Sequence, residues 1–166
     1  MQHLLQRAAR VGARLTTRGE TVAVAESSAG GLVSASLLAV PMASAFFMGG
    51  AVTYTAIARE ALAGITAMEM TGLRSSSEPY ALLLARRLRE RLGTSWGLAE
   101  TGAAGPTGNR YGDAAGHSCF AIAGPVEAVL TLETGTVERW ANMQAFADGA
   151  LALLEDALAK PGGPGG

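Results

Sequence analysis

A serine in a run of small residues is the first feature of this sequence with a chemical use. Ser27 belongs to the segment 26–31, Glu-Ser-Ser-Ala-Gly-Gly, which follows the apolar run 21–25 and precedes the helical run 32–39. A helix N-terminus presents unpaired backbone N–H groups and partial positive charge. A serine placed there is suited to act as a nucleophile beside an oxyanion-binding site, or to help bind an anion. The position equally suits an ordinary N-cap serine, since Ser is a favoured cap in any protein.

A second small-residue segment, 101–108, follows a candidate strand over 96–101. Its glycines and alanines allow the backbone to approach a ligand closely, although a Gly/Pro-rich turn is usually only a turn. The segment lacks the Gly-Lys-Ser/Thr of a phosphate loop and the glycine fingerprint of dinucleotide-binding proteins. Tyr54 ends another candidate strand. Tyr54, Arg59 and Arg139 could each be surface or packing residues, and their spacing in the sequence does not exclude this.

The elements that must position these residues are helices alternating with strands. Helices are expected over about 2–17, 32–39, 55–63 and 141–158, and another is expected to begin at Ser77-Glu78-Pro79 with Ser77 as N-cap. Strands are expected over 21–25, 45–54, 96–101, 117–123 and 126–132. The strand 45–54 is expected to contain a bulge at Gly49-Gly50. This order predicts an α/β fold, a three-layer α/β/α sandwich with a mixed sheet of about five strands. Ligands of such sheets bind beyond the carboxyl ends of strands, so segments 26–31 and 101–108 and Tyr54 are expected to converge.

The composition limits the classes of function. The 166 residues, with 49% apolar residues, predict a single domain over 1–160, followed by a disordered Pro/Gly tail over 161–166. A net charge of −1 gives no electrostatic reason to expect nucleic acid or a membrane as partner, whereas a small anionic ligand needs only one or two local cations. No apolar run approaches a membrane span.

Cysteine and histidine usage points to a metal-free protein of a reducing compartment. The single cysteine, Cys119, has apolar neighbours and is expected in the core, which suits a cytoplasmic location. His3 and His117 are far apart in sequence, and no His/Cys/carboxylate cluster has metal-site spacing. No metal or cofactor is therefore expected.

Six collinear segments resemble motifs of one known family. They are 25–32 (A-E-S-S-A-G-G-L), 49–54, 77–79, 101–106 (T-G-A-A-G-P), 116–123 and 138–139. They are similar to the A-E-S-C-T-G-G-L, G-x-V-x-Y, S-E-x, T-G-I-A-G-P, G-T-V-x-x-A and D-R motifs of the CinA C-terminal family. The resemblance covers roughly residues 5–158.

The resemblance implies an amidohydrolase that converts nicotinamide mononucleotide to nicotinate mononucleotide and ammonia. Family members use a serine, a nearby lysine and tyrosine, and an arginine before the last helix. Matched by motif, these positions are Ser27, Arg59, Tyr54 and Arg139. The two small-residue segments supply the expected substrate-binding residues: Glu26, Ser28, Ala29, Gly30, Gly31, Thr101, Gly102, Ala103 and Gly105. Family members also tend to form homo-oligomers.

Position 59 departs from the family pattern in a way that bears on mechanism. A desolvated lysine can lose its proton and act as a general base, but the pKa of arginine is too high for that role. A Ser–Lys dyad is thus not available. The family's asparagine is Ala56 here, its threonine is Ala29, and its cysteine is Ser28, which conserves size.

Two acidic residues could replace the missing base, Glu26 beside Ser27 and Glu100 before Thr101. Each could equally cap a helix or pair with Arg59 or Arg139.

Three functions are therefore open: an amidohydrolase acting on a pyridine nucleotide or a similar amide, a non-catalytic or differently active member that binds a nucleotide or small anion, and a structural interaction domain. The small residues kept in segments 26–31 and 101–108 argue against the third. Ser27, Tyr54 and Arg139 favour the enzyme, and Arg59 discriminates between the first two.

Overall fold

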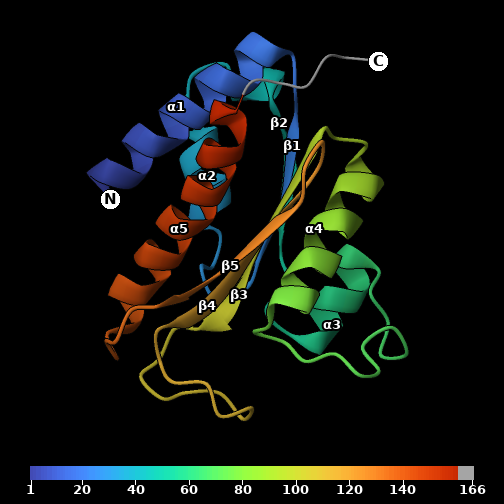
Figure 1. The fold of residues 1–166 in the computed structure, drawn as a ribbon, viewed down its shortest axis with the longest axis vertical. Helices are drawn as coiled ribbons and strands as arrows, with labels where there is room; N and C mark the ends of the chain where they lie inside the picture. The colour runs from blue at the N-terminus through green and yellow to red at the C-terminus, as the bar shows by residue number, and fades with distance from the viewer. Residues whose placement is uncertain (161–166) are drawn as a thin grey trace.

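The computed structural model describes residues 1–160 and shows a three-layer α/β/α sandwich (Figure 1). Its sheet has five strands in the order β2-β1-β3-β4-β5. The strands are β1 (Val22–Glu26), β2 (Phe47–Val52), β3 (Trp96–Ala103), β4 (His117–Ala123) and β5 (Ala128–Glu133). β1 pairs in parallel with β2 and β3, whereas β3, β4 and β5 pair antiparallel. The predicted mixed sheet and fold class are confirmed; the tail 161–166 lies outside the described residues.

Helices cover both faces of the sheet. One face carries α1 (Gln2–Arg18), α2 (Leu32–Leu38) and α5 (Arg139–Ala159). The other face carries α3 (Ala56–Ala58), a π-helical turn η2 (Arg59–Ala63) and α4 (Glu78–Leu92). A short 3₁₀ turn, η1 (Ala43–Ala45), leads into β2. None of the helices within residues 1–160 combines the length and apolarity needed to span a bilayer.

Local signals explain several boundaries. Gly19, in the left-handed region with φ 63°, ends α1, and the Ser77 hydroxyl accepts a hydrogen bond from the Tyr80 amide at the start of α4. In β2, Val22 pairs with Phe47 but Ala23 pairs with Gly49, so one residue is left over. The predicted bulge therefore lies at Met48, directly before the glycine pair.

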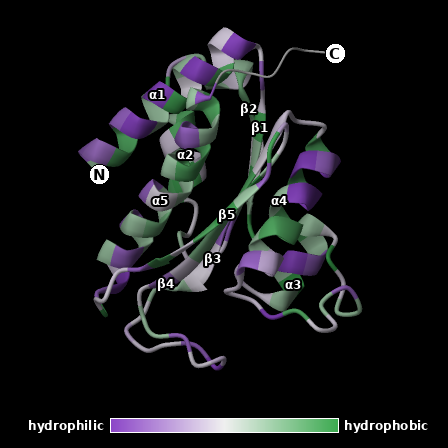
Figure 2. Ribbon diagram, in the orientation of Figure 1, coloured by the Kyte–Doolittle hydropathy of each residue, from purple (hydrophilic) through white to green (hydrophobic). Residues whose placement is uncertain are grey.

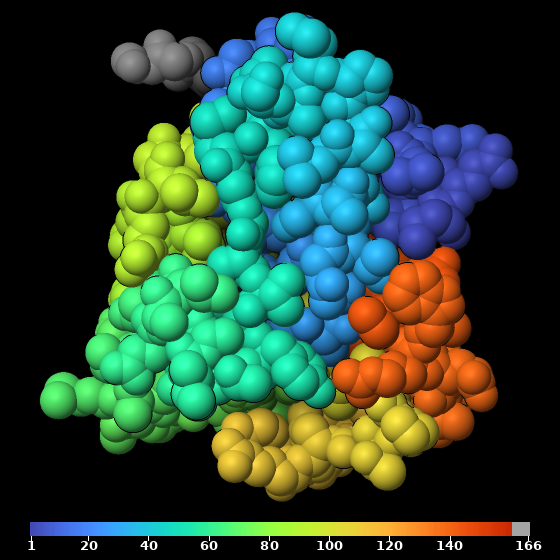
Figure 3. All heavy atoms as spheres, turned by 180° about the vertical axis from the view of Figure 1, so that it is seen from behind, coloured from blue at the N-terminus to red at the C-terminus, as the bar shows by residue number. Residues whose placement is uncertain are grey.

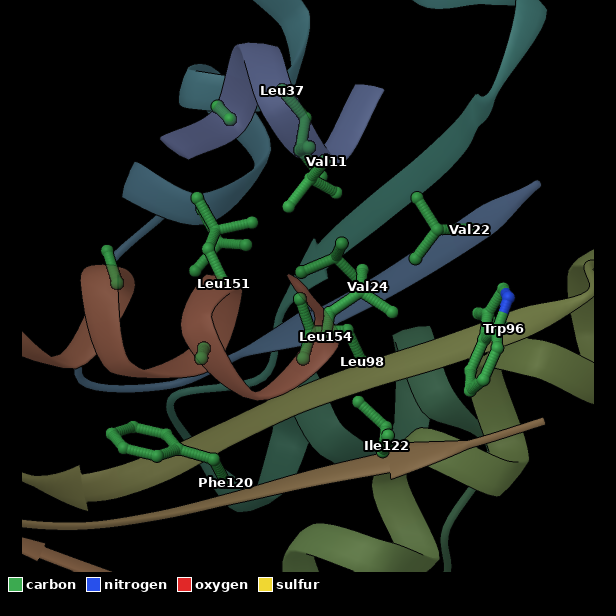
Figure 4. Close-up of a cluster of buried hydrophobic side chains, with 14 of the residues drawn as sticks. Val11, Val22, Val24, Leu37, Trp96, Leu98, Phe120, Ile122, Leu151 and Leu154 are labelled. Atoms are coloured by element: carbon green, nitrogen blue, oxygen red, sulfur yellow. The ribbon is translucent and has the colours of Figure 1, made fainter. Parts of the chain in front are cut away.

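Large apolar side chains fill the layer between the sheet and α1, α2 and α5. Figure 4 shows Val11 and Leu37 from the helices facing Val24 and Leu98 of the sheet, with Trp96 at one end. Figure 2 shows α1 apolar toward this layer and hydrophilic outward. This core holds the five strands and three helices together.

The opposite face of the sheet is built from small residues. Ala23, Ala25, Ala99 and Ala121 form the sheet side of the α4 core. Helix α4 approaches so closely that a Cβ added to Gly97 would lie 1.9 Å from the carbonyl oxygen of Ala85. Cys119 is buried in this layer, as expected for a core cysteine.

Candidate active site

A cavity of about 440 Å³ lies beyond the carboxyl ends of the parallel strands β1, β2 and β3. Five of the predicted site residues line it: Ser27, Tyr54, Arg59, Thr101 and Gly102. They come from the turn after β1, the segment after β2 and the last residues of β3, and they converge as the rule for open α/β sheets predicts. In Figure 3 the gold 104–116 loop meets the green segment after β2 and the orange start of α5 along this edge of the molecule.

A second, smaller cavity of about 250 Å³ shares Tyr54, Gly102 and Asn109 with the first. Ser28, Ala103, Gly105 and Arg139 also line it.

Arg139 ties the two cavities together. Its guanidinium donates to the carbonyl oxygen of Gly105 at 2.6 Å and to the phenol oxygen of Tyr54 at 3.3 Å. The structure thus brings Ser27, Tyr54, Arg59, Arg139 and the 101–108 segment to one region of the surface.

Glu26 lies outside both cavities, although the sequence suggested that it binds substrate. Its side chain is fully buried. It accepts hydrogen bonds from the amides of Gly31, Val33 and Ser34 at 3.2, 2.8 and 2.9 Å, and from the Ser34 hydroxyl at 2.7 Å. The Glu26 carboxylate therefore caps α2, because it is the acceptor for amides at the start of that helix.

Glu100 occupies the other side of the Ser27 turn in the same manner. Its fully buried carboxylate accepts from the amides of Ser27 and Ala29 at 3.0 and 2.8 Å, and from the hydroxyls of Ser28 and Ser118 at 2.6 and 2.9 Å. Burial raises the pKa of Glu100, and these hydrogen bonds oppose the shift. Because all four donors face this carboxyl and it lines neither cavity, Glu100 is a structural group rather than a base for Ser27.

These two glutamates change the expectation about anion binding at the helix start. Helix α2 begins at Leu32, as expected, and the turn before it carries Gly30, whose amide donates to the Ser27 carbonyl at 3.1 Å. The amides of Ala29 and Gly31 are bound by Glu100 and Glu26. The expectation that unpaired N–H groups beside Ser27 bind an anion or an oxyanion is therefore wrong for the amides of Ala29, Gly30 and Gly31.

The Ser27 hydroxyl differs from its neighbour. The Ser28 hydroxyl is committed to Glu100, whereas that of Ser27 has no hydrogen-bond partner within residues 1–160 and lines the larger cavity. Ala29, Gly30 and Gly31 line neither cavity and shape the turn instead.

The cavities are cationic. Arg59 donates to the Ile65 carbonyl at 3.3 Å and lines the larger cavity together with Arg110. Among the residues of 1–160 that line the two cavities, none is Asp, Glu, His, Lys or Cys. An anion is thus favoured over a cation as ligand.

Sequence reasoning missed the loop 109–113, which supplies Asn109, Arg110 and Tyr111 to the cavity. The Asn109 side-chain oxygen accepts from the amides of Tyr111 and Asp113 at 3.0 and 3.1 Å. The available signal was an Asn-Arg-Tyr-Gly-Asp run directly after a small-residue segment already assigned to the site.

His117 fixes another wall of the cavity. Its Nε2 lies 2.9 Å from the carbonyl oxygen of Ser76, a cavity residue in the left-handed region with φ 57°, and its Nδ1 contacts the carboxylate of Glu133. Burial alone would lower the pKa of His117, but the hydrogen bonds to Glu133 and Ser76 and the nearby Asp113 raise it. Both ring nitrogens face acceptors, so the doubly protonated imidazolium suits this geometry.

Comparison with known proteins places the chain. The family model of the CinA C-terminal domain matches residues 5–158. A CinA-like protein of Anaeromyxobacter sp. (strain K) is 41% identical over 150 residues, which are 89% of this chain and 36% of that protein. A CinA-like protein of Prochlorococcus marinus is 42% identical over 111 residues, 67% of this chain and 26% of the relative. The chain thus spans about a third or less of the length of these relatives.

Solved structures agree with this assignment. The structure of a competence-damaged protein (CinA) superfamily protein from Klebsiella pneumoniae matches with a TM-score of 0.87 at 26% identity, covering 94% of this chain and 98% of that one. The competence/damage inducible protein of Agrobacterium tumefaciens matches with a TM-score of 0.86 at 28% identity, covering 95% and 96%. The chain belongs to the CinA C-terminal domain family.

Proposed function

We propose that the protein is an amidohydrolase that deamidates nicotinamide mononucleotide, or a related pyridine-nucleotide amide, to the acid and ammonia. One observation carries the proposal: the Ser27 hydroxyl, free of partners within residues 1–160, shares one cationic cavity with Tyr54 and Arg59. Membership of the CinA family supports the reaction class. We place the protein in the cytoplasm as a homo-oligomer, an association state that analytical ultracentrifugation tests.

The cavity suits a small phosphorylated ligand. Its volume of about 440 Å³ is in the range that encloses small molecules, roughly 300–1,000 Å³. Arg59 and Arg110 line the same space, and guanidinium groups bind phosphate oxygens through paired, charge-assisted hydrogen bonds.

The proposed chemistry proceeds through an acyl-serine. The Ser27 oxygen attacks the carboxamide carbon, the C–N bond breaks, and ammonia leaves with the proton that the serine gave up. Water then hydrolyses the ester, which gives the carboxylate and restores Ser27.

Tyr54 is the proposed donor to the oxyanion, since the amides of Ala29 and Gly31 are bound to glutamates. The Tyr54 oxygen accepts from Arg139, which leaves its hydroxyl hydrogen free to point at the substrate oxygen.

Ammonia release from nicotinamide mononucleotide tests the proposal. We expect weak activity in the parent, none in Ser27→Ala, and parental activity in Ser44→Ala, a control at an exposed serine in η1. Arg59→Lys should raise the rate because lysine can shed its proton. Losing a general base typically lowers the rate by about 10²–10⁴-fold. Ala29 and Ala56 limit how much of that rate Arg59→Lys restores, because they lack polar groups to position the new lysine.

Parent activity that survives Ser27→Ala unchanged would exclude Ser27 as the nucleophile. No ammonia from either the parent or Arg59→Lys would favour the second candidate, a non-catalytic or differently active member that binds a nucleotide or small anion. Arg59 supports that candidate because it binds anions but does not accept protons. Calorimetric titration with nicotinamide mononucleotide measures binding in that case, with the Arg59→Ala/Arg139→Ala double variant as comparison.

A further inference from the structure

Tyr111 is a cavity residue to which neither the family motifs nor the reaction described above gives a role. Its side chain is 37% exposed and lines the same cavity as Ser27. Two guanidinium groups lie over its ring, that of Arg74 at 5.4 Å from the ring centre and that of Arg110 at 5.1 Å. Arg110 also donates a hydrogen bond to the phenol oxygen at 3.1 Å.

The loop holds this arrangement firmly. The Tyr111 backbone amide donates to the side-chain oxygen of Asn109, and the side-chain nitrogen of Asn109 donates to the Asp113 carboxylate at 2.8 Å. The same carboxylate receives two hydrogen bonds from Arg74, at 2.5 and 3.1 Å. The Asp113 carboxylate thus holds Arg74 in place while the guanidinium lies over the Tyr111 ring. The ring and its two cations therefore need little rearrangement before reaction.

The cavity offers few other groups for proton transfer. Its lining within residues 1–160 contains no carboxylate, imidazole, amine or thiol, which leaves the phenols of Tyr54, Tyr80 and Tyr111. Tyr80 is 3% exposed, and its burial raises its pKa. Tyr54 contacts one guanidinium, whereas Tyr111 has two around it.

From this geometry we infer that Tyr111 is the catalytic proton acceptor for Ser27, in the role that lysine fills in the family motif. The inference rests on the proposed amidase function. The Tyr111 phenolate takes the Ser27 proton within the cavity that both residues line, as the serine oxygen bonds to the carboxamide carbon. The neutral phenol then returns that proton to the departing nitrogen as the C–N bond breaks, so the first half-reaction ends with acyl-serine, ammonia and phenolate.

The charge around Tyr111 supports the phenolate. The hydrogen bond from Arg110 and its positive charge lower the pKa of Tyr111, against a smaller opposing effect of burial. Arginine keeps its charge at every working pH. The rate should therefore rise with pH as the phenol ionises.

Two measurements test the assignment. The chain has only three tyrosines, so phenolate absorbance during a pH titration of the parent and of each single Tyr→Phe variant assigns every ionisation. We expect the phenol that ionises at lowest pH to disappear in Tyr111→Phe and to ionise at higher pH in Arg110→Gln. For ammonia release from nicotinamide mononucleotide, Tyr111→Phe should lower kcat about 10²–10⁴-fold, with KM little changed, and should abolish the rise of rate with pH. Tyr54→Phe should keep that pH dependence.

The outcomes separate the two proposals. A parent that releases no ammonia overturns the amidase and this role of Tyr111 with it. A parent whose activity depends on Ser27 but is unchanged, in rate and pH profile, by Tyr111→Phe overturns the Tyr111 assignment alone. The assignment also fails if the phenol that ionises at lowest pH persists in Tyr111→Phe.

Discussion

The two sides of the cavity are built in opposite ways. On the strand side, the turn that carries Ser27 has its neighbouring amides and the Ser28 hydroxyl bound to the buried carboxylates of Glu26 and Glu100. On the loop side, Arg110 and Tyr111 are exposed and line the same cavity as Arg59. The strand side therefore fixes one serine in place, and the loop side contributes a cation, Arg110, and a phenol, Tyr111. A turn fixed by buried carboxylates and a loop rich in charge thus line the same cavity.

The largest expected effect is on the strand side, in Glu100→Ala. The variant leaves the partly buried amide of Ser27 and the buried amide of Ala29 without an acceptor. An unsatisfied buried donor costs about 1–3 kcal/mol, so the free energy of unfolding should fall by roughly 2–6 kcal/mol. Urea denaturation measures the loss. Glu100→Gln, which keeps one acceptor oxygen, should lose less, and a Glu100→Ala protein as stable as the parent would contradict a structural role for this carboxyl.

A smaller effect of a different kind is expected on the loop side, in Arg110→Ala. Arg110 is exposed, so the stability of the protein should stay within about 0.5 kcal/mol of the parent. Binding of nicotinamide mononucleotide should weaken by about 1.5–3 kcal/mol, the typical contribution of a charged hydrogen bond. Calorimetric titration and urea denaturation on the same samples check both parts. Arg86→Ala, on the outer face of α4 and paired with Glu127 rather than with the cavity, is the matched control.

The smallest expected effect is a pH dependence of stability that comes from His117, which binds the Ser76 carbonyl in the cavity wall. The pKa of His117 is raised in the folded protein, so its contribution to stability is complete below the ordinary histidine pKa and is lost as the pH rises through the folded value. The urea midpoint of the parent should fall over that range, and His117→Gln should remove this part of the slope. Equal slopes in the two proteins would show that folding does not change the pKa of His117.

Much of the fold was predictable because its signals are local. The apolar run before Glu26, the N-cap Ser77 and the glycines beside the β2 bulge each act within a few residues. The convergence of Ser27, Tyr54 and Arg139 followed from one rule about strand ends and from the family motifs.

The rest depended on contacts between distant segments. Glu100 binds the Ser27 turn from 73 residues away, and no periodicity predicts which carboxylate reaches which amide. The Arg74–Asp113 pair, which supports Tyr111, joins residues 39 positions apart. The sequence thus predicted several residues that line one cavity, but not which backbone donors near Ser27 are already bound.

The alanine face under α4 has a consequence for redesign of the protein. Gly97 lies too close to the Ala85 carbonyl for a side chain, and alanines cover the neighbouring strands. Almost any larger residue at these positions would add atoms to a layer that has no room for them. A library that randomised this face would contain few folded members.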